Sequence, residues 1–324
     1  MKRLLILAAL AGCAPAGGVA PATPADVDGN RLLEHVRVLA HDSMQGRRAA
    51  TPGSEKARRY LLAQYQRIGL EPVGGTYEHP FNFSPRRDST TVLRGINLLG
   101  KVTGTRHPDH YIVVTAHYDH VGVGRAVNGD SIYNGADDNA SGTAALLAMA
   151  EHFRRNRPAA TIIFAALDAE EMGLKGAQAF VDSPPVPKER IVLNVNMDMV
   201  SHSEKGELYA AGASHYPYLR PHLEEVAGRA PIRLLLGHDR PEPTPQDDWT
   251  MQSDQGAFHR AGIPFVYFGV EDHPDYHRPS DEVRTITPEF FAGAARTVLD
   301  AVRTFDRNVQ ELARQRVGVA PGNP

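Results

Sequence analysis

The stretch HYDHVGVGRAVNGDSIYNGADDNASG, residues 117–142, decides how the rest of the chain is interpreted. It follows the apolar run 111–116, YIVVTA, which predicts a buried strand, and it precedes residues 143–150, TAALLAMA, which predict a helix. A loop in this position lies at the carboxyl end of a strand, where open α/β sheets bind their ligands. Its imidazole and carboxylate groups suit a divalent metal such as zinc. They belong to His117, Asp119, Asp137 and Asp138.

The composition is that of an ordinary globular protein. The chain has 324 residues, a formal net charge of −3 and 42% hydrophobic residues. A charge this close to zero, without a basic run, argues against nucleic acid as a partner. The sequence has no internal repeat and no run of about 18 apolar residues that would predict a membrane-spanning helix.

The first thirteen residues, MKRLLILAALAGC, resemble a bacterial lipoprotein signal, with a basic start, a short apolar run and a final Leu-Ala-Gly-Cys. We therefore expect a signal peptide over residues 1–12 and a lipidated, flexible tether over residues 13–27. Cys13, the only cysteine, would carry the lipid and be the sole attachment to a membrane, on the periplasmic side or at the outer membrane. The alternative is an ordinary secretory signal cleaved near Ala20, which predicts a secreted protein.

Strands and helices alternate along the remaining chain, which predicts an α/β fold. Besides the strand at 111–116, we expect strands at 161–167, 191–199 and 263–270. We expect helices at 32–39, 54–68, 143–150, 174–181, 219–226, 253–261 and 287–312. Ser54 is the expected N-cap and Gly69 the expected C-cap of the second helix. Residues 234–251 are expected to form a loop and residues 317–324 a disordered tail, which leaves one catalytic domain over residues 28–316.

Groups able to bind a metal follow several of these strands. His117 ends one strand, Glu170 and Glu171 follow the next, and Asp198 lies at the end of a third. The loop after the last strand carries His273, Asp275 and His277. Because the carboxyl ends of parallel strands meet at one edge of a sheet, we expect these side chains to converge there.

Six sequence blocks, taken together and in this order, resemble the co-catalytic di-zinc aminopeptidases, the family of aminopeptidase Y and aminopeptidase S in peptidase clan MH. The resemblance extends over residues 31–305. The blocks are HYDH at 117–120, NGADDNASG at 134–142, EEMGLKG at 170–176, NMDM at 196–199, SD at 253–254 and HPDYHRPSD at 273–281.

The resemblance implies a fold and a metal centre. The fold would be a three-layer α/β/α sandwich with a mixed, mostly parallel central sheet. Two zinc ions per chain are implied, one held by His117 and Asp198 and the other by Glu171 and His277. Asp137 would bridge the two ions. Asp138 would then be excluded as a ligand, and a cis peptide bond would join these two aspartates.

The resemblance also implies a peptidase mechanism. Glu170 would act as general base on a metal-bridging hydroxide that attacks the N-terminal peptide bond. Asp119 would accept the far N–H of His117 and so fix its tautomer. Tyr276 is a candidate donor to the oxyanion. The implied partners are peptide substrates, and we expect a monomer.

Other functions remain open at this point. A glutaminyl cyclase-like enzyme or a carboxypeptidase of similar fold would use related zinc chemistry, and a peptidase-like binding module would have lost catalysis. Serine and cysteine hydrolases are excluded, because the chain lacks a Gly-x-Ser-x-Gly motif and its only cysteine lies in the leader. His120 and His273 are expected to be structural or to lie at the rim of the site. Trp249 is expected either to line a specificity pocket or to anchor a loop.

Overall fold

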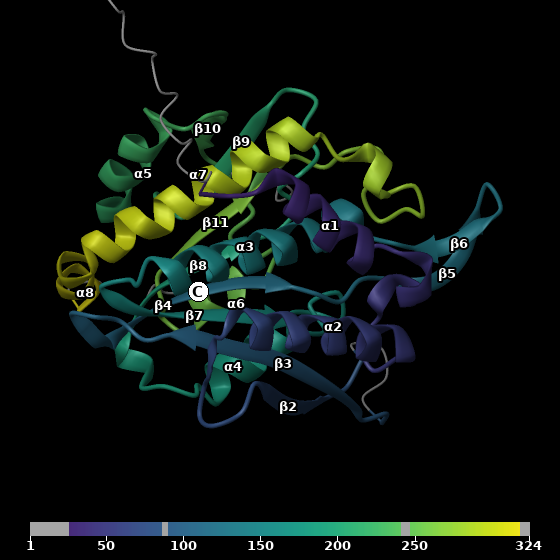
Figure 1. Ribbon diagram of the computed structural model, residues 1–324, viewed down its shortest axis with the longest axis horizontal. Coiled ribbons are helices and arrows are strands. Elements are labelled where there is room, and N and C mark those ends of the chain that lie inside the picture. The colour runs from purple at the N-terminus through teal and green to yellow at the C-terminus, as the bar shows by residue number, and fades with distance from the viewer. Residues whose placement is uncertain (1–25, 86–89, 241–246, 318–324) are drawn as a thin grey trace, which may run out of the picture.

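The computed structural model describes residues 26–85, 90–240 and 247–317 (Figure 1). The predicted signal peptide, Cys13, most of the predicted tether and all of the predicted tail at 317–324 except Val317 lie outside these ranges. Val317 is the last residue of the helix at Val309–Val317. Within them, no helix combines the length and the apolar character that a membrane crossing requires.

A mixed sheet of nine strands, counted over the described ranges, forms the centre of the fold. Its path runs β1-β3-β7-β4-β8-β11-β9-β10, and β2 also pairs with β3. The four strands β7, β4, β8 and β11 are parallel neighbours, whereas β1, β2 and β3 add antiparallel strands at one edge. The strands are β1 Glu71–Pro72, β2 Glu78–Phe83, β3 Leu93–Val102, β4 His107–His117, β7 Ala160–Leu167, β8 Ile191–Met197, β9 Glu207–Ala211, β10 Arg233–Leu236 and β11 Phe265–Gly269.

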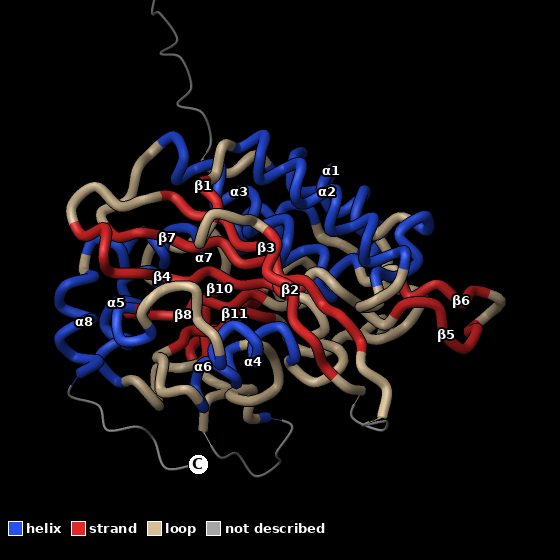
Figure 2. Tube along the Cα trace, turned by 90° about the horizontal axis from the view of Figure 1, so that it is seen from below, coloured by secondary structure: helices blue, strands red, loops and turns tan. Residues whose placement is uncertain are grey.

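Helices cover both faces of this sheet (Figure 2). On one face lie α1 Gly29–Leu39, α2 Pro52–Ile68, α3 Gly142–Arg155 and α7 Pro288–Arg307, and on the other lie α4 Lys175–Asp182 and α6 Gln255–Arg260. The helices α5 Arg220–Ala227 and α8 Val309–Val317 pack at the end near α7. The hairpin of β5 Gly122–Val127 and β6 Asp130–Tyr133 projects from the body (Figure 1). The predicted three-layer fold class is confirmed.

The alternation of side chains along β4 explains why its inner part, residues 111–116, is apolar except for Thr115. Ile112 and Val114 belong to the core beneath α1, α2 and α3, whereas Val113 belongs to the core beneath α4 and α6. All three are fully buried. Complete burial of such a side chain contributes about 1.5–3 kcal/mol, which favours apolar residues in a strand between two helical layers. The buried Thr115 is accommodated because its hydroxyl donates to Asn196 Oδ1 at 2.6 Å.

Several boundaries differ from the sequence predictions. Thr51, not Ser54, is the N-cap of α2, because its hydroxyl accepts the Ser54 N–H. Gly69 ends that helix with φ of 77°, as predicted. The predicted loop at 234–251 begins inside β10, and β9 was not anticipated. The predicted helix at 287–312 is two helices, separated at Asn308.

Candidate metal centre

The carboxyl ends of the four parallel strands bring the predicted groups together. His117 is the last residue of β4, Asp198 follows β8, and Glu170 and Glu171 follow β7 by three and four positions. His277 lies in the loop after β11. The predicted convergence at one edge of the sheet is therefore observed, and it follows from the parallel register of these strands.

Two groups of metal-binding side chains lie at this edge. One consists of His117, Asp138 and Asp198, and the other of His120, Asp138, Glu171 and His277. Within each group the candidate ligand atoms all lie within 4.8 Å of one another.

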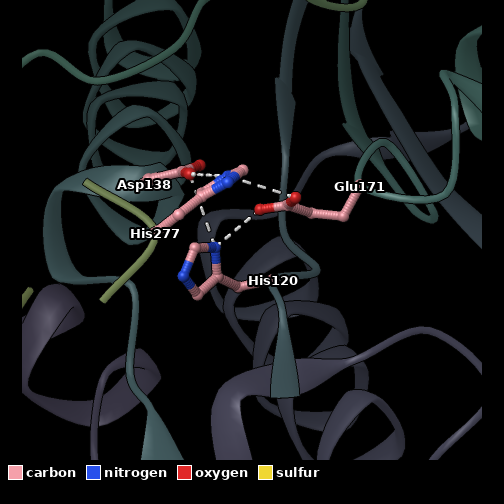
Figure 3. Close-up of side chains that lie close together, drawn as sticks. All are labelled: His120, Asp138, Glu171 and His277. Atoms are coloured by element: carbon pink, nitrogen blue, oxygen red, sulfur yellow. Dashed lines mark ion pairs between the residues drawn. The ribbon is translucent and has the colours of Figure 1, made fainter. Parts of the chain in front are cut away.

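The distances between side chains define the two groups further. His117 Nε2 lies 3.2 Å from Asp198 Oδ1 and 3.4 Å from Asp138 Oδ1. In the other group, His277 Nε2 lies 3.1 Å from Asp138 Oδ2 and 3.2 Å from Glu171 Oε2 (Figure 3). Asp138 thus presents one oxygen to each group.

The structure contradicts the predicted bridging position of Asp137. Asp137 Oδ1 accepts hydrogen bonds from the backbone N–H and the hydroxyl of Ser201, both at 2.7 Å, and Oδ2 lies 3.1 Å from His273 Nε2. Its carboxylate therefore faces away from both groups, and Asp138 occupies the shared position. The predicted cis peptide bond is displaced in the same direction, to Asp138–Asn139. Both predictions are therefore wrong by one residue. The conformation of the turn over Ala136–Ser141 decides which of the two adjacent aspartates faces the site.

Asp281 holds this turn in place. Its two carboxylate oxygens accept the backbone N–H groups of Asp137 and Asp138 at 2.9 and 3.0 Å. Burial, together with the neighbouring Asp137 carboxylate, raises the pKa of Asp281 to about 7, although the two N–H groups act in the opposite sense. The backbone of Asp138 is thus tied to the loop that also carries His277.

Arg47 supports the same turn from below, a role that the sequence did not reveal. Its guanidinium is fully buried and donates to the carbonyl oxygens of Tyr118, Leu39, Asn134 and Gly135. Burial lowers the pKa of Arg47 to about 10, opposed first by the charge of Asp138, so the group stays protonated at neutral pH. One buried cation therefore connects α1, the end of β4 and the turn that carries Asp138.

Asp119 links His117 to Glu170, although not in the predicted way. His117 Nδ1 lies 3.2 Å from the backbone oxygen of Asp119 and 3.7 Å from its carboxylate, so the carbonyl rather than the carboxylate accepts the far N–H. Asp119 Oδ1 instead accepts the backbone N–H of Glu170 at 3.0 Å. The same residue thereby orients an imidazole and positions the backbone of the predicted base.

Glu170 and Glu171 point to different parts of the site. Glu171 contacts His120 and His277, whereas Glu170 belongs to neither metal-binding group and lines the cleft. Burial raises the pKa of Glu170 well above its usual value, opposed by His117 and reinforced by Glu171. Glu171 is also buried, but its contacts with His120 and His277 hold its pKa well below the usual value. The two adjacent carboxyls are therefore electrostatically distinct, as a base and a ligand need to be.

His120 does not lie at the rim, which was one of the two alternatives predicted for it. Its ring is fully buried, and Nδ1 lies 2.8 Å from Glu171 Oε1 and 3.5 Å from Asp138 Oδ2 (Figure 3). His120 lies three residues after His117, the last residue of β4. The alternation of side chains along a strand therefore does not extend to His120, and nothing in the sequence indicated that its ring contacts Glu171 and Asp138.

Three residues beside the site adopt left-handed backbone conformations, which is unusual for side chains other than glycine. Ala169, Met199 and His277 have φ values of 59°, 57° and 53°. Each such residue costs of order 1–3 kcal/mol and persists where the surroundings impose it. They turn the chain sharply where β7, β8 and the last loop deliver Glu170, Asp198 and His277.

A cleft of about 880 Å³ opens onto these groups. Tyr276 lines it and stacks on His277 with ring centroids 4.0 Å apart. Trp249 reaches the same cleft and stacks on His238 at 3.7 Å, so it is both a wall residue and a packed anchor. Trp249 thus lines a cleft and is packed in its loop at the same time, and its part in substrate specificity stays a prediction.

Asp254 occupies the N-cap position of α6, but its side chain makes no capping hydrogen bond. Both of its carboxylate oxygens are buried and find no hydrogen-bond partner among the described residues. Burial raises the pKa of Asp254 to about 7, with Asp119 and Asp198 acting in the same direction and His117 opposing them.

The chemistry of the site fits zinc. Asp138, Asp198 and Glu171 place three carboxylates within a small, mostly buried volume, where concentrated negative charge is costly unless cations compensate it. The donors are imidazole nitrogens and carboxylate oxygens without thiolate, a set typical of hydrolytic zinc sites. The fold and this donor set together define a zinc enzyme with the exopeptidase-like α/β/α fold.

Comparison with known proteins supports this class. The sequence model of peptidase family M28 matches residues 97–302. Aminopeptidase YwaD of Bacillus subtilis is 30% identical over 258 residues, which cover 73% of this chain and 51% of that protein. The chain thus spans about half the length of the curated relatives it matches. It belongs to peptidase family M28, so the prediction of a zinc metallopeptidase is confirmed at the level of the family.

Solved structures agree on the fold. A zinc aminopeptidase from Bacillus subtilis matches with a TM-score of 0.69 at 19% identity, over 85% of this chain and 94% of that one. A glutaminyl cyclase from Bacteroides thetaiotaomicron, bound to N-acetylhistamine, matches with a TM-score of 0.68 at 19% identity, over 86% and 98%. At this identity both likenesses concern the fold alone, which does not separate a peptidase from a cyclase.

Proposed function

We propose that this protein is an aminopeptidase that binds two zinc ions and removes N-terminal residues from peptides. The observation that carries the proposal is the shared Asp138 carboxylate, which offers one oxygen to each of two groups of imidazole and carboxylate donors. A site for one ion needs no such shared carboxylate. This favours two zinc ions over the single zinc expected for a cyclase.

Each ion would have its own residues. His117 and Asp198 would hold one, Glu171 and His277 the other, and Asp138 would contact both. His120 Nδ1, 2.8 Å from Glu171, is available as a further nitrogen donor or as a group that orients Glu171. Zinc supplies a Lewis acid that polarises a carbonyl and lowers the pKa of water towards about 7.

Glu170 would move the proton. It lies in the cleft outside both donor groups, and the N–H that it donates to Asp119 fixes its backbone. Burial raises the pKa of its carboxyl, and bound cations would act in the opposite direction. The carboxylate would accept a proton from the attacking water and return it to the leaving amine.

Tyr276 would assist at the carbonyl. Its ring stacks on His277, and burial, followed by the charge of Asp138, raises its pKa far above the usual value, so the hydroxyl keeps its proton. A neutral hydroxyl at this position donates a hydrogen bond to a developing oxyanion.

The test compares Glu170→Gln with Glu171→Gln. Glu170→Gln is expected to retain the wild-type zinc content and to lose roughly 10²–10⁴-fold in kcat, the usual contribution of a general base. Glu171→Gln is the matched control, with the same change one residue further on, and it is expected to lose zinc. Wild-type activity in zinc-loaded Glu170→Gln would refute the assignment of the base.

The substrate panel separates the competing functions. Aminoacyl anilides and peptides with free or acetylated N-termini test for an aminopeptidase, which is expected to require the free amine. Dependence on a free C-terminus would indicate a carboxypeptidase. Cyclisation of N-terminal glutamine with one zinc per chain would indicate a cyclase, and inactivity of the zinc-loaded protein across the panel would favour a binding module.

A further inference from the structure

We propose that His202, His273 and Asp275 form a third divalent-cation site, separate from the two donor groups that share Asp138. Each of the three residues offers one ligand atom, and these atoms all lie within 4.8 Å of one another. His202 follows β8 in the chain, and the other two lie in the loop after β11. None of them belongs to either of the other groups.

His273 is held as metal-binding histidines usually are. Its Nε2 lies 3.1 Å from Asp137 Oδ2, and its side chain is 5% exposed. Metal-binding histidines typically donate one ring N–H to a carboxylate, which leaves the other nitrogen as the ligand. The other nitrogen here, Nδ1, is buried and has no hydrogen-bond partner among the described residues. The Asp137 carboxylate, which faces away from the two donor groups that share Asp138, accepts the ring N–H at Nε2 of His273.

His202 repeats the same feature on the facing side. Its ring lies over that of His273 with centroids 4.1 Å apart and planes inclined by 31°. Its Nδ1 is also buried without a partner within the described part of the chain. Each of these two neighbouring rings thus buries an unpaired nitrogen, which is costly, and one cation coordinated by both rings would satisfy them.

The donor set indicates the class of ion. Two imidazoles and one carboxylate suit zinc and its neighbours cobalt and nickel, whereas calcium and magnesium prefer oxygen alone. Three protein ligands leave at least one position to water, as in open zinc sites.

A cation here would tie two loops together. It would join the segment after β8 to the loop that carries Tyr276 and His277, since His273 and Asp275 precede His277 by only four and two residues. This would hold His277, whose side chain is 41% exposed, in its position beside Asp138.

The test measures zinc content. Wild type, His202→Phe and Asp275→Asn are equilibrated with buffered zinc over a range of free concentrations, and bound zinc per chain is determined by elemental analysis. Phenylalanine keeps an aromatic ring against His273 and removes the ligand nitrogen. Wild type is expected to bind one zinc more than either variant at saturation. Since Asp275 lies near the surface, its variant keeps the test informative if His202→Phe folds poorly.

His110→Phe serves as the matched control. It removes a histidine from another cluster of two histidines and an aspartate, in which the His107 and His110 rings lie 6.1 Å apart and Asp109 contacts His110. It is expected to bind as much zinc as wild type. Glu171→Gln should lose zinc from the centre at Asp138 and keep the additional equivalent, which separates this proposal from the proposed function.

A crystal soaked with zinc supplies the second readout. Anomalous scattering at the zinc edge is expected between His202 and His273 in wild type and absent there in His202→Phe. Equal zinc content in wild type, His202→Phe and Asp275→Asn, or no anomalous peak at saturating zinc, would overturn the proposal.

Discussion

Arg47 offers the sharpest test of how the scaffold holds the metal centre. The change Arg47→Met keeps an unbranched side chain in the same space and removes the charge and every donor. In wild type the guanidinium donates to four backbone oxygens at 2.6–2.9 Å, two of which belong to Asn134 and Gly135 just before the turn that carries Asp138.

The contacts set the size of the effect. The Gly135 oxygen also accepts the Ala140 N–H at 3.2 Å, so it keeps a partner, and the other three oxygens carry the loss. A buried acceptor left unpaired costs about 1–3 kcal/mol, which gives roughly 3–9 kcal/mol in all. Removal of one partner from a buried charged contact typically costs about 3–5 kcal/mol, which lies within this range, so we expect a net loss of that size.

The assay is thermal unfolding in the presence of a chelator, followed by a zinc titration. For a chain of this size the expected loss corresponds to a decrease in Tm of roughly 6–15 °C. Zinc affinity should fall as well, because the turn at Asp138 loses its support. Arg47→Lys should lie between wild type and Arg47→Met, since an ammonium keeps the charge but cannot reach all four oxygens.

Arg48→Met is the control for a general effect of removing an arginine. Arg48 is the adjacent residue, and its guanidinium donates to a single backbone oxygen, that of Val121, at 3.2 Å. It should change stability by less than about 1 kcal/mol, as exposed polar contacts usually do. A Tm for Arg47→Met within 2 °C of that for Arg48→Met would refute the view that Arg47 supports the centre.

Three further predictions concern the site. Asp138→Asn should lose more bound zinc than Asp137→Asn, as measured by elemental analysis; equal losses would contradict the shared position of Asp138. Tyr276→Phe should lower kcat on the order of 10²-fold with little change in KM, whereas unchanged kcat would remove Tyr276 from the mechanism. The pKa of Asp254, about 7 in the folded protein, lies above the value near 3.9 of an unfolded aspartate, so its stabilising contribution is present below pH ~4 and is lost as pH rises towards 7. Asp254→Asn, compared with wild type by chelator-treated unfolding at pH 5 and pH 8, should therefore gain relative stability at pH 8, and a constant difference between the two pH values would count against it.

Much of the fold was predictable because the signals are local. The strands β4, β7, β8 and β11 each contain a mostly apolar run, as strands between two helical layers usually do, and each is followed by polar residues. The strand β9, which is antiparallel to β11, was missed although Gly206 and Gly212 flank it, because its five residues are few and show no strict alternation of apolar and polar side chains. The split of the C-terminal helix at Asn308 was also missed, because the apolar pattern continues across it.

The sequence alone determined which chemical groups gather at one edge of the sheet. The order and spacing of the blocks that contain His117, Glu170, Asp198 and His277 were enough for this, because parallel strands deliver whatever follows them to the same edge.

Only the tertiary structure decided which of these groups face one another. Asp137 and Asp138 are identical in chemistry and adjacent in sequence, and the turn held by Asp281 and Arg47 selects the second of them. His120, Asp254 and the pair of His202 and His273 owe their positions to chain segments far away in sequence. The direction of a side chain at the end of a strand depends on backbone angles, and contacts with distant segments impose these angles. Composition and residue spacing do not reveal such contacts.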